Sequence, residues 1–96
     1  MSDFLEQAAA ELNNRVEGAD IDGTAKFAIT DVGAIMLDSN GARVGDEEAD
    51  VTLNADADTF RSIFEGELNP TSAFMTGKLS VDGDMGLAMK LAAALA

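Results

Sequence analysis

The chain has 96 residues, of which 47% are hydrophobic, and its 18 acidic residues outnumber its 6 basic ones, giving a formal net charge of −12. This length suits one domain with one small core, and the hydrophobic content excludes a disordered chain. The negative charge argues against nucleic-acid binding and against electrostatic docking on anionic membranes. The chain contains no cysteine, which excludes disulfides and thiol chemistry and predicts a cytoplasmic protein.

The N-terminal segment has the spacing of an amphipathic helix. Apolar residues recur on one helical face at Leu5, Ala8, Ala9, Leu12 and Val16. Ser2 is a candidate N-cap, and Gly18 is a candidate helix stop. The pattern predicts a helix over residues 3–17. The N-terminal residues Met1-Ser2-Asp3-Phe4 have no basic region and no cleavage pattern of a secretory signal. No run in the chain approaches the 18 or so apolar residues of a membrane span.

Four short segments alternate between apolar and polar residues, as strands buried on one face do. They cover residues 24–30, 34–38, 50–54 and 78–82, and their inward residues include Phe27, Ile29, Ile35, Leu37, Val51, Leu53, Leu79 and Val81. Clean alternation favours an antiparallel sheet. The connector Asp31-Val32-Gly33 joins the first two strands as a hairpin, Ser39-Asn40-Gly41 has turn chemistry, and residues 46–48 form a polar loop.

Helices are predicted between the third and fourth strands and after the fourth. Asp56 or Asp58 caps a helix that carries Phe60, Ile63 and Phe64 and ends at Gly66. A shorter helix starts at Asn69-Pro70, with Phe74 and Met75 on its apolar side. Asp82-Gly83-Asp84 then turns the chain and caps a final helix.

These elements follow one another in the order α-β-β-β-α-α-β-α. One apolar sheet face needs a cover, and the helices supply it. We therefore predict a single domain over residues 1–96 with an α+β fold of two layers, in which helices cover the apolar face of one mainly antiparallel sheet.

The residue types in the chain argue against catalysis. The chain contains no His, Cys, Tyr or Trp, which removes the commonest general base, the thiol nucleophile and the usual zinc ligands. Lys26, Lys78 and Lys90 each have a plainer role on a strand or helix surface. Residues 54–58 alternate oxygen ligands, but Thr59 occupies the place where a calcium loop needs glycine. We expect no enzyme activity, no cofactor and no metal.

The final helix is apolar on two sides. On a helical wheel, Met85, Ala88, Met89, Ala92 and Ala96 line one side, and Leu87, Leu91, Ala94 and Leu95 line another. Both sides can be packed in the core, which is the usual arrangement for such a helix. The alternative is that the methionine side faces an apolar ligand or a partner, since methionine adapts to varied apolar shapes.

The same C-terminal region carries a family resemblance. The runs Phe74-Met75-Thr76-Gly77-Lys78-Leu79, Gly83-Asp84-Met85 and Leu87-Ala88-Met89-Lys90-Leu91, together with residues 60–66 and Asn69-Pro70, resemble the signature of the sterol carrier protein type 2 domain family. The resemblance covers roughly residues 50 to 91. It implies an apolar tunnel between the sheet and the helices. The strong negative charge departs from the basic character of the family's better-known members.

With this resemblance, the expected function is non-catalytic intracellular binding and transfer of apolar ligands such as sterols, fatty acids or acyl-CoA. The expected lipid-binding residues are Phe27, Ile29, Ile35, Leu37, Val51, Leu53, Phe60, Phe64, Phe74, Met75, Leu79, Met85, Ala88, Met89 and Ala92. The C-terminal helix closes the tunnel, with Gly83 and Gly86 acting either as hinges or only as turn and packing residues. The alternative function is a protein-interaction or homodimerisation module that uses this helix, so a monomer and a homodimer both remain open. Any membrane contact is transient and not driven by charge.

Overall fold

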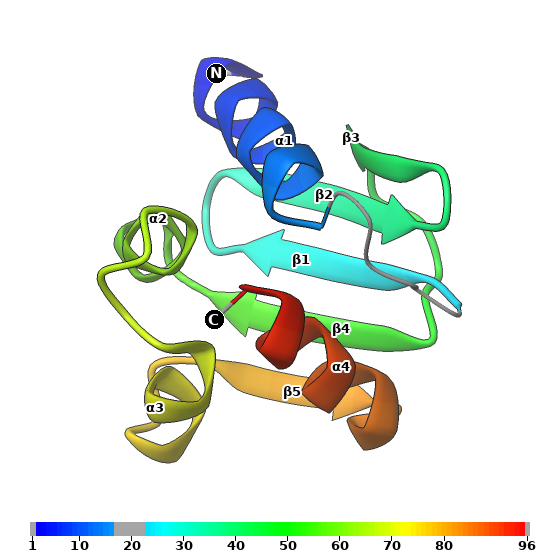
Figure 1. The fold of residues 1–96 in the computed structure, drawn as a ribbon. Coiled ribbons are helices and arrows are strands. Elements are labelled where there is room, and N and C mark those ends of the chain that lie inside the picture. Colours follow the sequence, from blue (N-terminus) through cyan, green and yellow to red (C-terminus); the bar gives the residue numbers. More distant parts are fainter. Residues whose placement is uncertain (1, 17–22, 96) are drawn as a thin grey trace.

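The computed structural model describes residues 2–16 and 23–95, which form four helices and five strands (Figure 1). In chain order these are α1 (Ser2–Arg15), β1 (Ala25–Ile29), β2 (Gly33–Asp38), β3 (Gly41–Val44), β4 (Val51–Ala55), α2 (Ala57–Phe64), α3 (Pro70–Met75), β5 (Ser80–Gly83) and α4 (Met85–Leu95). The proposed stop at Gly18 lies outside the described residues.

The five strands form one sheet in the order β3-β2-β1-β4-β5. Three of the neighbouring pairs are antiparallel, and the central pair β1·β4 is parallel. The predicted mainly antiparallel sheet is therefore confirmed, with one parallel pair that the alternation pattern did not reveal. In this register Phe27 of β1 lies opposite both Ile35 of β2 and Leu53 of β4.

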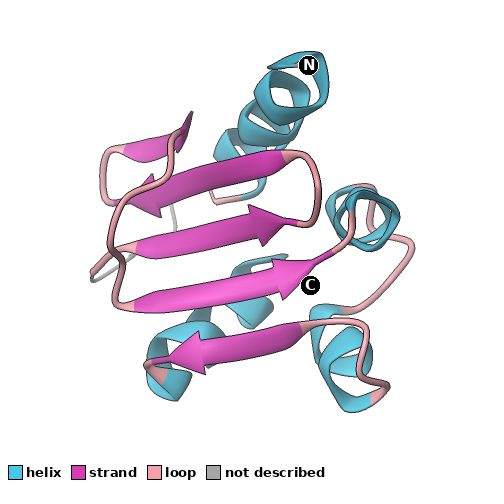
Figure 2. Ribbon diagram, turned by 180° about the vertical axis from the view of Figure 1, so that it is seen from behind, coloured by secondary structure: helices cyan, strands magenta, loops and turns pink. Residues whose placement is uncertain are grey.

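All the helices lie on or around one face of the sheet. In Figure 1, α1 lies over the β2–β3 side and α4 over the β4–β5 side. Seen from behind in Figure 2, the strands lie in front of the helices. This arrangement confirms the predicted α+β fold of two layers. It also divides the apolar face of the sheet between two covers, α1 on one side and α4 on the other.

Three phenylalanines form the centre of the core. The Phe27 ring meets the rings of Phe60 and Phe64 edge-on, at centroid distances of 5.8 and 6.2 Å. Phe60 and Phe64, four residues apart on α2, stack at 5.6 Å. All three side chains are buried. Residues four apart share one face of a helix, so the spacing within α2 directly creates the surface that packs on β1.

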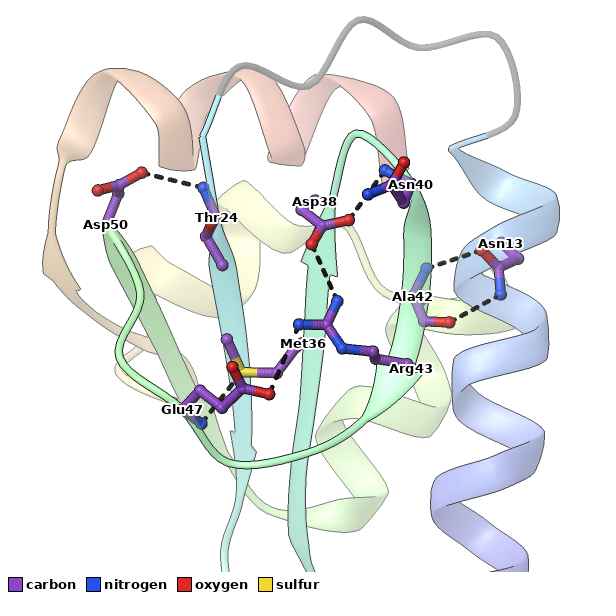
Figure 3. Close-up of polar contacts among 9 residues, drawn as sticks. All are labelled: Asn13, Thr24, Met36, Asp38, Asn40, Ala42, Arg43, Glu47 and Asp50. Carbon is purple, nitrogen blue, oxygen red and sulfur yellow. Dashed lines mark hydrogen bonds and ion pairs between the residues drawn. The ribbon is translucent and has the colours of Figure 1, made fainter.

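The opposite face of the sheet carries the connection from β3 to β4, residues 45–50. Figure 3 shows Met36 of β2 with its sulfur accepting a hydrogen bond from the Glu47 N–H at 3.4 Å. Lys26 of β1 pairs with Asp46 at 2.9 Å. Met36 is fully buried although it lies on the face that α1 and α4 do not cover. The connection therefore covers part of the sheet face on which none of the described helices lies.

Strand β3 is the element missing from the predicted order. Ser39 and Asn40 form a two-residue hairpin loop, and the Asp38 carboxylate accepts a hydrogen bond from the Asn40 N–H at 2.8 Å. On the free edge of β3, the Asn13 side chain of α1 accepts from the Ala42 N–H at 2.8 Å and donates to the Ala42 carbonyl at 3.1 Å (Figure 3). A side-chain amide thus pairs with an edge strand that would otherwise expose its backbone.

The helix caps of α2 and α3 lie where the sequence predicts them. Asp56 caps α2, with its carboxylate accepting from the Thr59 N–H at 2.8 Å. Asn69 caps α3 and Pro70 takes its first position. The last predicted strand begins two residues late, at Ser80, because the N–H groups of Lys78 and Leu79 both donate to the Ala73 carbonyl. Those two bonds end α3 and delay the strand.

The Asp56 cap makes the stability of α2 dependent on pH. Hydrogen bonds from Thr59 to its carboxylate lower the pKa of Asp56 below its usual value of 3.8. A group with a lowered folded-state pKa stabilises the fold above the unfolded-state pKa and loses this effect as the pH falls through the folded-state pKa. We therefore expect Asp56→Ala to lower the Tm near pH 7 and to have a shrinking effect below about pH 4.

Thermal unfolding followed by circular dichroism over this pH range measures the effect. Asp58→Ala is the matched control, since it removes an exposed carboxylate from the first turn of the same helix and leaves the cap in place. If Asp56→Ala and Asp58→Ala lowered the Tm equally at every pH, the cap would contribute nothing beyond its charge.

Candidate functional site

A pocket of about 460 Å³ lies between α2, α3, α4 and the part of the sheet formed by β1, β4 and β5. Its size falls within the range of about 300–1,000 Å³ that is usual for small-molecule sites. The described residues that line it are Phe27, Leu53, Phe60, Ile63, Pro70, Thr71, Phe74, Met75, Leu79, Val81, Met85, Ala88, Met89, Leu91, Ala92 and Ala93. Every one of these side chains except Thr71 is apolar.

The pocket has a buried floor and an open mouth. Phe27, Phe60 and Leu53 form the floor, and each is at most 5% exposed. At the mouth, Met75 of α3 is 80% exposed and Met89 of α4 is 70% exposed. Helix α4 therefore forms one wall of the pocket and leaves an opening toward solvent, where the sequence had predicted a tunnel closed by this helix.

Hydrogen bonds at its first turn hold α4 in place beside the pocket. The Asp84 carboxylate accepts from the N–H groups of Gly86 and Leu87, at 2.9 and 3.2 Å. The Asp84 N–H donates to the Asp50 carbonyl at the start of β4, at 2.9 Å. On the sheet side of the helix, Leu87 and Leu91 are buried. The leucine side of α4 thus packs in the core, and the methionine side borders the pocket.

The chemistry of the pocket suits an apolar ligand. The lining described by the structure contains no charged side chain, and Thr71 is its single hydroxyl. Two polar side chains at the ends of α3 are already engaged within that helix, because Asn69 caps α3 and the Thr76 hydroxyl donates to carbonyls of α3. Within residues 2–16 and 23–95, no three acidic side chains come together as metal ligands.

The predicted lipid-binding residues separate into two groups. Those at the pocket are Phe27, Leu53, Phe60, Phe74, Met75, Leu79, Met85, Ala88, Met89 and Ala92. The others are buried core residues outside the pocket lining: Ile29, Ile35, Leu37, Val51 and Phe64. The apolar sheet face is wider than the pocket, and α1 together with Phe64 of α2 covers the remainder. Strand alternation identifies this face but does not say which helix covers each part of it.

Six lining residues were not among the predicted site residues: Ile63, Pro70, Thr71, Val81, Leu91 and Ala93. Each of them had a usable signal in its spacing from a predicted residue. In the helices, Ile63 follows Phe60 by three positions and Thr71 precedes Met75 by four, so each shares a face with a predicted residue. Val81 follows Leu79 by two positions and so lies on the same face of its strand.

A model of the SCP-2 sterol transfer family matches residues 2–96. The chain belongs to this family. The resemblance drawn from the C-terminal signature is confirmed, and it extends over nearly the whole domain. As an SCP-2 domain, the chain has its pocket between the sheet and the helices α3 and α4, next to the segments that carry that signature.

A solved relative has the same overall structure as this SCP-2 domain. Sterol carrier protein-2 from Aedes aegypti, determined in complex with the C16 fatty acid palmitate, superposes with a TM-score of 0.80 and 27% identity. The alignment covers 100% of this chain and 97% of that protein. The shared architecture therefore includes every layer of the fold, and it occurs in a relative that holds a fatty acid.

Curated relatives match about half of this chain and are much longer proteins. Hydroxysteroid dehydrogenase-like protein 2 is 54% identical over 44 residues in Danio rerio and 46% identical over 59 residues in Homo sapiens. These alignments cover 46% and 57% of this chain, but only 11% and 14% of those proteins. The chain thus spans a small part of the length of these relatives.

Proposed function

We propose that this domain binds a single-chain lipid, such as a long-chain fatty acid or its ester, in the pocket between α3, α4 and the sheet, and that it does so without catalysis. The observation that carries the proposal is a 460 Å³ pocket with one hydroxyl and no charged side chain in its described lining. The palmitate complex of the Aedes aegypti relative supports this ligand class.

The energetics favour a flexible acyl chain. Each buried CH₂ contributes roughly 0.8 kcal/mol, so about twelve buried methylenes supply on the order of 10 kcal/mol before association costs of several kcal/mol. With an association cost of about 4 kcal/mol, the net value of about 6 kcal/mol corresponds to a Kd of roughly tens of micromolar. Because the lining offers few polar partners, a head group is best left at the open mouth, where water solvates it. Selectivity then depends on chain length and shape more than on head-group chemistry.

Native mass spectrometry of protein purified without detergent tests the proposal. We expect either a co-purified lipid or, after delipidation, uptake of one palmitate per chain and displacement of a fluorescent fatty acid. A bare protein that neither takes up palmitate nor quenches or displaces the probe would exclude lipid binding. A dimer whose pocket mouth is covered by a second copy would instead support the interaction module.

A further inference from the structure

The mouth of the pocket is surrounded by exposed apolar side chains. Phe74, Met75, Met85 and Met89, here called the mouth patch, are 44%, 80%, 47% and 70% exposed. All four line the pocket, and they come from the two helices that flank its opening. Within the described residues, Val44 on the distant edge strand is the other large exposed hydrophobic residue. The exposed large hydrophobic residues are therefore concentrated at one place.

The acidic residues of the chain lie outside the segments that carry the mouth patch. None of the 18 acidic residues falls within residues 70–81 or 85–96, the segments that form α3 and α4. Lys78 and Lys90 are the charged residues of these segments. Two acidic residues lie between these segments. Asp82 follows Val81 in β5, so it lies on the face of the strand away from the pocket. Asp84 has its carboxylate bound to two N–H groups of the first turn of α4, where the helix dipole favours negative charge. The mouth patch is thus a nearly uncharged area on a strongly acidic protein.

These features fit a lipid surface better than a second copy of the chain. A specific protein interface takes about 20–30 residues from each partner, and the mouth patch offers four large side chains. Two copies would also bring two bodies of net charge −12 together. A bilayer needs no complementary shape, since exposed methionine and aromatic side chains insert among lipid chains at low cost.

The charge distribution also selects the type of bilayer. An anionic surface repels the acidic body, including the exposed Asp46, Glu47 and Glu48 of the connection behind the sheet. A zwitterionic surface exerts no such net repulsion. On such a surface the uncharged mouth patch can enter the lipid while the acidic remainder stays in water.

From these observations we infer that the mouth patch docks the domain, pocket opening first, on bilayers of zwitterionic phospholipid. The ligand then passes directly between bilayer and pocket without crossing water. The inference rests on the proposed lipid binding for its purpose, because the docked opening is the opening of the same pocket. Docking itself needs no ligand, so it is measured separately.

Flotation with phosphatidylcholine vesicles tests the docking with ligand-free protein. We expect the wild-type chain to float with these vesicles, and we expect flotation to fall as phosphatidylserine replaces phosphatidylcholine. Raising the ionic strength should restore part of the loss, since salt shortens the range of the repulsion. Met75→Glu combined with Met89→Glu should reduce vesicle binding by tenfold or more.

Two matched variants show whether the loss belongs to the mouth patch. Val44→Glu places a carboxylate at an exposed apolar position on β3, away from the mouth, and should still float. Met75→Leu combined with Met89→Leu keeps the patch apolar and should also float. The inference is overturned if the wild-type chain stays with the soluble fraction, or if Val44→Glu abolishes flotation as fully as the double glutamate variant. A dimer in sedimentation velocity that the double glutamate variant converts to monomer would also overturn it.

Transfer kinetics test the direct passage of ligand. Protein loaded with a fluorescent fatty acid is mixed with vesicles that contain a quencher. Direct passage predicts a first-order transfer rate that rises in proportion to vesicle concentration, and a rate independent of vesicle concentration would overturn it. If the protein cannot be loaded at all, the proposed function fails, and flotation still reports on docking alone.

Discussion

Replacing Met85 by aspartate is expected to weaken fatty-acid binding by well over tenfold while the fold persists. Met85 lines the pocket at the start of α4 and is 47% exposed. In the free protein water solvates the new carboxylate, but a bound acyl chain displaces that water from an apolar wall, at a cost of about 2–3 kcal/mol or more for a charged group. Fluorescent fatty-acid displacement measures the affinity, and thermal unfolding measures the stability.

The fold should tolerate aspartate at position 85. Met85 is the first residue of α4, where an acidic side chain interacts favourably with the helix dipole. Val44→Asp is the control for added negative charge, and Met85→Leu is the control for altered shape. Both should bind the probe nearly as the wild type does. Unchanged affinity in Met85→Asp would mean that the ligand does not use this wall, and unfolding would mean that Met85 belongs to the core.

The fold could be predicted from the sequence wherever one local pattern decides an element. Apolar spacing predicted α1 and α2, and the residues before α2 and α3 predicted their caps. The missing element was β3, whose four residues include one strong strand former, Val44, and whose backbone at Ala42 forms two hydrogen bonds with the Asn13 side chain of α1. A tertiary contact between residues 29 positions apart leaves no local signal.

The parallel pairing of β1 with β4 was also missed because it leaves no signal in the local sequence pattern. Alternation of apolar and polar residues is identical in parallel and antiparallel strands when one face is buried. What determines the pairing here is the path of residues 45–50 behind the sheet, held by Lys26–Asp46 and by the Glu47 N–H on Met36. The fully buried Met36 was the available sign of such a cover, because it lies on the polar side of an alternating strand.

The pocket could be predicted only in part, because its position depends on which part of the apolar sheet face the helices leave uncovered. Sequence periodicity places Ile35 and Leu53 on the same sheet face, yet Ile35 is core and Leu53 lines the pocket. The difference is the position of α1 over β2 and β3. For α4, the helical wheel distinguished the two sides of the helix. Leu87 and Leu91 on one side are buried, whereas Met85 and Met89 on the other side are exposed.

Gly83→Ala is expected to lower the stability by about 3 kcal/mol and the Tm by about 12–24 °C. Gly83 is the last residue of β5, with φ at +109°, a backbone conformation that costs an alanine about 1–2 kcal/mol. A Cβ at this position would also overlap the backbone oxygen of Asp50 and lie 3.0 Å from the Val51 Cα. Neither backbone atom can move without disturbing β4, so the overlap adds to the strain.

Gly77→Ala separates these two causes. Gly77 also has a positive φ, at +80°, but a Cβ there meets nothing within 4 Å. It should therefore carry only the backbone strain, about 1 kcal/mol, and lower the Tm by about 4–8 °C. Equal losses in the two variants would show that Gly83 serves only as a turn residue. A larger loss at Gly83 would show that this glycine lets β5 approach β4 closely, and that this contact fixes the start of α4 beside the pocket.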